Sequence, residues 1–399
     1  MLSRTKTSWL CLSLGILVCG CLLGSVSSSP SGQKARRNST GTIPAAEFSR
    51  LIQEFSEEGG FFFSDNFISN ETAYPYILGK FKELGLSGGA YIGVGPEQNF
   101  NYIAKIRPQI AFVVDIRRQA VIQHLMYKAV FHLAENRAQF LSWLFSKPLV
   151  GDITPGRDSS LDEMLEYFRQ APTSEEIFSK NLPILRKAIE EDFKFPLSAQ
   201  DVQALRYVYS AFWQANLDIT FRSGRVGFPG SRRRGFPTLR DLLLANDATG
   251  NGASFLASEE DYGFLRRLQR QNRIIPVIGD FAGKKALAAV ANYLRENGYE
   301  VTAFYTSNVE QYLVEDQVFG AFVENIRKLP VSPNSMILRM VRTGWEPHPA
   351  YIPGHRMSPL LQRITVFLED YDRDLFPDYW GLVTRDYIAP NGTSSRQEP

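Results

Sequence analysis

The sequence predicts an α/β fold with a doubly wound, mostly parallel sheet, and three observations carry that prediction. An apolar run at residues 90–94 breaks into a turn containing Gly93 and Gly95, and a second apolar run at 110–114 ends on Asp115. From residue 273 onward, apolar strands and helical segments alternate, as they do in βαβ units. Residues 150–270 lie between these two regions and show helical spacing without clear strand alternation. The prediction is therefore a Rossmann-like sheet that carries a large helical insertion at 150–270.

Residues 1–23 are typical of a signal peptide. Arg4 and Lys6 precede an apolar stretch, 9–18, that is too short for an ordinary membrane span. Residues 17–21 resemble a bacterial lipoprotein box, in which Cys21 would carry the lipid. Cleavage near residues 27–29 and retention as an uncleaved anchor remain open as alternatives. Each version predicts an extracytoplasmic protein, either membrane-anchored through a lipid or signal anchor, or secreted.

The rest of the chain divides by composition. Residues 24–43, rich in Ser, Gly, Arg and Lys, are predicted to be a flexible linker, 44–390 the folded domain, and 391–399 a disordered tail. All three cysteines lie in the leader, so the folded part has no disulfide and no thiolate metal site. The net charge of +2 argues against nucleic acid as a partner. No metal site is predicted either, since His124 and His132 have no partner at metal-ligand spacing.

Each element follows from hydrophobic periodicity and from the glycines and prolines that interrupt it. In chain order we expect helices at 44–58 and 74–85, strands at 90–94 and 110–114, and a long helix at 119–145. Insertion helices follow at 161–169, 175–192 and 199–217. The last part is expected to hold strands at 274–281, 301–313 and 336–341, with helices at 284–296, 318–328 and about 360–371.

Two acids stand at predicted strand ends, Asp115 and Asp280, and a polar loop, 305–312, follows a third strand. Ligands of open α/β sheets bind outside the carboxyl ends of the strands, so these elements should meet in one crevice. An acid at the end of the second strand accepts hydrogen bonds from ribose hydroxyls in such folds. The predicted partner is therefore a small nucleoside-type ligand.

Three other site types fit poorly. A dinucleotide fingerprint needs a third glycine where Gln98 stands, and Pro96 removes a backbone donor from the turn. Residues 85–89 match the serine-hydrolase pattern, but the helix precedes the serine and the strand follows it, which reverses the required order. Residues 279–285 lack the spacing and hydroxyl of a phosphate loop.

A Rossmann-like methyltransferase fits best. The shortened turn through Gly93 and Gly95 corresponds to one that binds the amino-acid part of S-adenosylmethionine, which is the expected cofactor. Asp115 would hold the ribose, and Asp280 with Phe281 resembles the acid and aromatic that bracket adenine. The loop 305–312 would face the substrate, with Ser307, Asn308 and Glu310 as candidates and none singled out as catalytic. Methyl transfer mainly needs alignment, so the absence of a catalytic triad is compatible with it.

Two further segments stay open between a functional and an ordinary role. The polar residues Asn66, Asn70 and Glu71 either line the crevice or cap turns and helices. The Arg-rich segment 221–236 is either a solvated loop or a lid over an anionic ligand.

A closer resemblance covers roughly residues 48–345. The strings DNFISNETAY, GGAYIGVGPEQNFNYIA, FVVDIRR, HLMYKAVF, ASFLASEEDY, VIGDFAGKKAL and AFYTSNVEQYL resemble those of an uncharacterised bacterial family with a methyltransferase-like Rossmann fold and no assigned reaction. The resemblance implies further site candidates, which are Asn66, Asn70, Glu71, Glu97, Gln98, Asn99, Glu259 and Glu260. Glu97 joins the cofactor-binding group as part of the glycine turn.

The sequence thus supports two hypotheses. The first is an S-adenosylmethionine-dependent methyltransferase-like protein of unknown substrate. The second follows from the leader, which sends the domain to a compartment where that cofactor is not normally supplied. In the second hypothesis the chain is a membrane-tethered extracytoplasmic binding or scaffold protein that keeps the fold without catalysis.

Overall fold

A computed structural model describes residues 41–151, 154–221, 236–342, 348–390 and 392. The predicted leader with Cys21, most of the linker, most of the Arg-rich segment and most of the tail lie outside these residues. All secondary structure below belongs to the compact unit that spans residues 38–399.

The centre of the fold is a six-stranded sheet in the order β3-β2-β1-β4-β5-β6. Its strands are β1 (Ala90–Gly93), β2 (Ile110–Asp115), β3 (Ile274–Ile278), β4 (Val301–Ser307), β5 (Val331–Arg342) and β6 (Met357–Arg363). The first five run parallel, and β6 pairs with β5 in the antiparallel direction. The residues of β1, β2 and β3 are all buried, as expected for strands covered on both faces. The protein is therefore a mixed α/β fold with a mostly parallel sheet.

The chain reverses its direction of travel across the sheet between β1 and β4. From β1 it moves outward to β2 and β3, and it then returns to place β4 on the other side of β1. The carboxyl ends of β1 and β4 therefore flank a topological switch point, where open parallel sheets hold their ligands.

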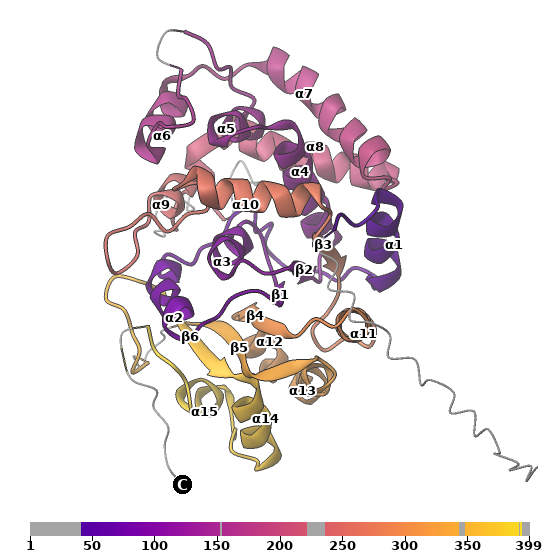
Figure 1. Cartoon of the computed structure of the whole chain (residues 1–399), viewed down its shortest axis with the longest axis vertical. Coiled ribbons are helices and arrows are strands. Elements are labelled where there is room, and N and C mark those ends of the chain that lie inside the picture. The colour runs from indigo at the N-terminus through magenta and orange to yellow at the C-terminus, as the bar shows by residue number, and fades with distance from the viewer. Residues whose placement is uncertain (1–40, 152–153, 222–235, 343–347, 391, 393–399) are drawn as a thin grey trace, which may run out of the picture. The chain divides into compact units, whose positions relative to one another are not determined.

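Helices cover both faces of the sheet (Figure 1). One group contacts β2, β3 and β5 and comprises α1 (Ala45–Phe55), α11 (Ala286–Glu296), α13 (Phe319–Arg327) and α14 (Ile364–Asp372). The other group comprises α2 (Leu78–Glu83), α3 (Gln98–Ile106), α4 (Arg118–Leu133) and α10 (Glu259–Arg270). A short 3-10 turn, η1 (Tyr74–Ile77), leads into α2 and contacts β6.

The segment 150–270 is helical where the structure describes it. It holds α6 (Leu161–Gln170), α7 (Glu175–Lys187), η2 (Ala188–Asp192), α8 (Ala199–Ala215), η3 (Asn216–Asp218) and α9 (Leu239–Leu243), and it ends with α10. Helices α7 and α8 pack on α4 together with α5 (Arg137–Phe145), so they add a layer outside the helices that cover the sheet (Figure 1).

The five parallel strands are confirmed, and three expectations about local structure are wrong. The predicted helix 119–145 is two helices, because Asn136 caps a new one by accepting a hydrogen bond from the backbone of Gln139. The expected polar loop 305–312 contains α12 (Val309–Glu315). The helix expected at 360–371 begins only at Ile364, since the preceding residues pair with β5 as the edge strand β6. A last short helix, α15 (Tyr379–Thr384), follows.

Candidate functional site

The glycine turn after β1 is held from inside by Asn99. Its amide nitrogen donates to the carbonyl oxygens of Val94, Gly95 and Pro96 at 2.9, 3.1 and 2.8 Å, and its oxygen accepts from Tyr91 at 3.0 Å. A Cβ on Gly93 would lie 2.0 Å from that oxygen, so only glycine fits there. Gly95 differs, because its φ is +80° and a Cβ there would meet no atom within 4 Å. The turn thus leaves open space beside Gly95, as a ligand-approaching glycine would.

Glu71 reaches the carboxyl end of β4 from the polar segment before η1. Its carboxylate accepts hydrogen bonds from the Tyr305 hydroxyl at 2.5 Å and from the Ser307 hydroxyl. Neither donor carries charge, and burial raises the pKa of Glu71 to about 7 despite these hydrogen bonds. The same enclosure, with the charge of Glu71, raises the pKa of Tyr305. Glu71 can therefore gain or lose a proton near neutral pH.

Glu97 is a second buried carboxyl, at the start of α3. One oxygen accepts from the backbone N–H of Ser69 at 2.9 Å, and the other, Oε2, has no hydrogen-bond partner among the described residues. Burial raises the pKa of Glu97 to about 8; the Ser69 hydrogen bond lowers it, and the nearby charge of Glu71 raises it further. The two carboxyls thus interact in one low-dielectric region.

Other buried polar atoms on the segments that reach the carboxyl end of the sheet also lack partners. A buried polar atom without a hydrogen bond costs about 1–3 kcal/mol, so such atoms rarely cluster without a reason. Within the described part of the chain, the unpartnered atoms on these segments are Ser64 Oγ, Asn66 Oδ1, Glu97 Oε2 and His124 Nδ1. Asn66 is also in the left-handed region, with φ 49°. Gln98 Nε2 and Tyr102 OH lie close together but outside normal hydrogen-bond geometry. These unpartnered buried atoms make the region a candidate site.

His124 connects the cluster to the glycine turn. Its Nε2 lies 2.8 Å from the carbonyl oxygen of Gly95, which requires the proton on that nitrogen and leaves Nδ1 as an acceptor. Burial lowers the pKa of His124, so the ring is neutral at pH 7.

Asp115 lies at the end of β2 as predicted, but Arg117 already binds it. The guanidinium donates to both carboxylate oxygens at 3.0 and 2.8 Å, and the Arg117 backbone N–H adds a third hydrogen bond at 2.9 Å. Burial alone would raise the pKa of Asp115, but the charge and hydrogen bonds of Arg117 together lower it. A carboxylate has about four acceptor positions, so one remains for a ribose hydroxyl.

Phe281 and Asp280, the residues predicted to bracket adenine, make other contacts in this structure. The Phe281 ring is buried and packs on Phe304 and Phe322, with centroids 4.9 and 5.9 Å away. Asp280 is half-buried, and its Oδ1 accepts from the backbone of Ala282 at 2.9 Å in a local turn. Glu57 also occupies this loop, accepting from the backbone N–H groups of Lys285 and Ala286.

The predicted substrate-facing residues separate into two groups. Ser307 contacts Glu71 and takes a left-handed φ of 53°, a strained conformation of the kind found at functional sites. Asn308 is half-buried beside it, with its oxygen 3.4 Å from the Ser307 hydroxyl. Glu310 turns the other way, into a bidentate ion pair with Arg339 at 2.7 and 3.0 Å. Asn70 is half-buried next to Glu71 in the sequence.

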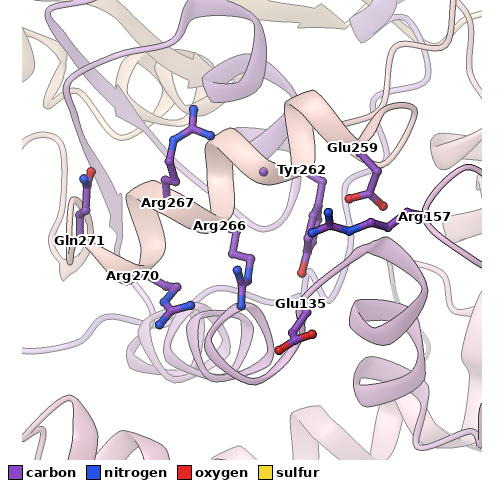
Figure 2. A pocket seen from close by; sticks show the side chains of 9 residues that line it. Glu135, Arg157, Glu259, Tyr262, Arg266, Arg267, Arg270 and Gln271 are labelled. Carbon is purple, nitrogen blue, oxygen red and sulfur yellow. The ribbon is translucent and has the colours of Figure 1, made fainter.

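Two surface cavities lie away from these residues, and neither is lined by Glu71, Glu97 or Asp115. One, of about 420 Å³, lies along α10 (Figure 2). The other, of about 600 Å³, lies between α2 and the chain near residues 247–249 and 388–392.

The sequence matches one family model, described as a domain of unknown function (DUF7790), over residues 66–148 and 149–369. These stretches cover most of the chain. The chain belongs to this family. No curated protein matches it. Nearly all of the switch-point residues, from Asn66 to Glu310, fall inside the matched stretches.

Sequence reasoning missed three residues that shape the site. Tyr305 was expected only as part of a loop, His124 as an ordinary helix residue, and Arg117 was not singled out. The charge pattern Asp115-x-Arg117 was the available signal, because the two side chains can meet across a turn. Two candidates suggested by the resemblance lie elsewhere: Glu259 pairs with Arg137 at 2.9 Å, and Glu260 is on the surface near Arg107.

Two further findings concern the membrane and metals. Across the described ranges, no helix combines the length and the apolar character that crossing a bilayer requires. Over the same ranges, no group of three or more His, Cys, Asp or Glu side chains is placed to bind a metal ion.

Proposed function

We propose that this protein is a methyltransferase-like α/β protein that binds a small nucleoside-type ligand at its switch point and moves a proton there through Glu71. One observation carries the proposal. Glu71 and Glu97 are two buried carboxyls that have no cationic partner among the described residues, and they lie near the carboxyl ends of β4 and β1.

The topology supports a Rossmann-like arrangement. The order 3-2-1-4-5 with parallel strands is that of the doubly wound fold, and the sixth strand keeps its position while running antiparallel. In such sheets the ligand lies over the first βα turn and the neighbouring strand across the switch point. Gly95 and Ser307 occupy these two places.

The chemistry of Glu71 supports a role as general base. A base works best when its pKa is close to the working pH, and the pKa of Glu71 is about 7. Ser307 and Tyr305 hold its oxygens in fixed positions. A substrate hydroxyl or amine placed beside the carboxylate would lose its proton to Glu71 as it becomes a nucleophile.

S-Adenosylmethionine, the expected cofactor, fits these residues only in part. The space beside Gly95 suits its amino-acid end, and the Glu97 oxygen that lacks a partner can accept a hydrogen bond from the ammonium group there. The adenosine end fits poorly, because Arg117 binds Asp115 and Phe281 packs in the core. No step of the proposal depends on this cofactor.

Calorimetry on the full chain with S-adenosylmethionine and S-adenosylhomocysteine tests the enzyme hypothesis. We expect saturable binding that weakens in Asp115→Ala and Glu97→Gln, with Arg206→Gln on the exposed face of α8 as a matched control. Absence of binding of either compound, or binding that Asp115→Ala leaves unchanged, would contradict the enzyme hypothesis.

The second candidate is a membrane-tethered binding or scaffold protein without catalysis. The Asp115–Arg117 pair and the buried Phe281 favour it, because Arg117 takes most of the acceptor positions of Asp115 and the Phe281 ring packs in the core. This second candidate predicts no heat of binding when the chain is titrated with S-adenosylmethionine or S-adenosylhomocysteine. It also predicts retention in the membrane fraction that is lost in Cys21→Ser, with the release followed by fractionation and lipid labelling.

A further inference from the structure

Helix α10 carries several arginines that form no ion pair with another described residue. Arg266 and Arg270 are four residues apart and share one face of the helix, and both side chains extend toward the end of α4 and Glu135 (Figure 2). Arg157 reaches the same cavity from the segment before α6. In the part of the chain that the structure describes, none of these three arginines forms an ion pair.

The cavity wall has a clear excess of positive charge. Four arginines line it (Arg157, Arg266, Arg267 and Arg270), against the acids Glu135 and Glu259. Glu259 is already paired with Arg137 at 2.9 Å. Glu135 is therefore the one lining acid left to balance the four guanidinium groups.

Arg266 is held in place rather than free in solvent. Its Nε donates to the carbonyl oxygen of Ala134 at 2.6 Å, and the Tyr262 hydroxyl donates to the same oxygen at 3.3 Å. This fixes the guanidinium plane and leaves its terminal nitrogens available to a ligand. A guanidinium presents paired donors that match the oxygens of a phosphate.

The pKa of His132 shows which charged side chains act near this cavity. The pKa of His132 is lowered first by burial, and then by the positive charges of Arg270, Lys128 and Arg266, while Asp192 opposes them. Arg266 and Arg270 are therefore close enough to His132 for their charges to act on it, as is Asp192 at 3.4 Å.

From the cavity, the fixed guanidinium and the unbalanced charge, we propose that this cavity binds a small phosphorylated compound. Its volume of about 420 Å³ falls within the range of small-molecule sites. The Arg266 and Arg270 guanidinium groups would bind the phosphate oxygens, and Arg157 would contact the ligand from the opposite wall of the cavity. This proposal is independent of the switch-point site.

The test is calorimetric titration of the full chain with inorganic phosphate and with pyrophosphate at low ionic strength. We expect saturable binding of both that weakens as salt is added. Arg266→Gln and Arg270→Gln should each weaken binding by about tenfold or more, because each removes a charge-assisted hydrogen bond. Arg206→Gln removes the same charge from exposed α8 and should leave binding unchanged.

Thermal unfolding of each variant shows whether it remains folded. Absence of saturable binding at millimolar phosphate and pyrophosphate would overturn the proposal. Equal binding by wild type and by two folded variants, Arg266→Gln and Arg270→Gln, would overturn it as well.

Discussion

Two regions next to each other at the carboxyl end of β4 bury carboxylates in opposite ways. Glu71 and Glu310 are equally buried, at 2% and 1% exposed. Glu310 meets the guanidinium of Arg339 through two hydrogen bonds, and Arg339 also donates to Gln362 at 2.7 Å. Within the described ranges, the Glu71 carboxylate accepts hydrogen bonds from hydroxyl groups alone. Burial alone therefore does not mark a site; burial without a counter-charge does.

The largest expected effect comes from removing the counter-charge of Glu310. Arg339→Met would leave Glu310 buried and uncompensated, and we expect it to lower the free energy of unfolding by about 3–5 kcal/mol. Replacing both residues, as in Arg339→Met with Glu310→Met, should restore most of that loss because no charge is left unpaired. Urea denaturation at pH 7 measures both. A single-variant loss below about 1 kcal/mol would show that the pair is not buried as described.

The second prediction concerns Glu97, a buried carboxyl without a counter-charge among the described residues. The pKa of Glu97 is about 8 in the folded protein, against an ordinary value of 4.5, so the folded state binds its proton more tightly. Its stabilising contribution is present below pH 4.5 and is lost as pH rises toward 8. Glu97→Gln, which stays neutral, should therefore be more stable than wild type at pH 8.5 by roughly 2–4 kcal/mol.

The control for this prediction is the same pair of proteins at pH 5. There the folded wild type carries a protonated Glu97, and the two should unfold at similar denaturant concentrations. Equal stability at pH 8.5 would mean that Glu97 is ionised without cost, and the contrast with Glu310 would disappear.

A smaller effect sharpens the role of Tyr305. Its hydroxyl stabilises the charged form of Glu71 and so lowers the pKa of that carboxyl. Tyr305→Phe should raise the pKa of Glu71 by roughly half a unit to one unit, since one such hydrogen bond contributes about 1 kcal/mol. NMR titration of the Glu71 carboxyl measures the shift. No upward shift would show that the hydroxyl does not act on Glu71.

The sequence could predict the strands and the glycine turn, but not the side chains that pair with the buried acids Glu71 and Glu310. The apolar runs gave the parallel strands, and the acid at the end of β2 and the glycine turn were correctly placed. The partners of Glu71 and Glu310 could not be predicted, because they come from other segments of the chain. Arg339 lies 29 residues after Glu310, and Tyr305 lies 234 residues after Glu71. The spacing of residues along the chain therefore cannot predict such pairs.

The edge strand β6 shows a second limit. Residues 357–363 and the helix after them are similarly apolar, so periodicity alone merges them into one element. Pairing with β5 decides that the first part is extended. Tertiary context thus overrides local pattern.

Carbon-13 NMR titration of the glutamate carboxyls in the full chain tests the central claim most directly, with Glu71→Gln and Glu97→Gln used to assign the signals. The account predicts two carboxyls that titrate as an interacting pair, with midpoints near pH 7 and pH 8. Titration of both carboxyls below pH 5, like ordinary exposed glutamates, would contradict it.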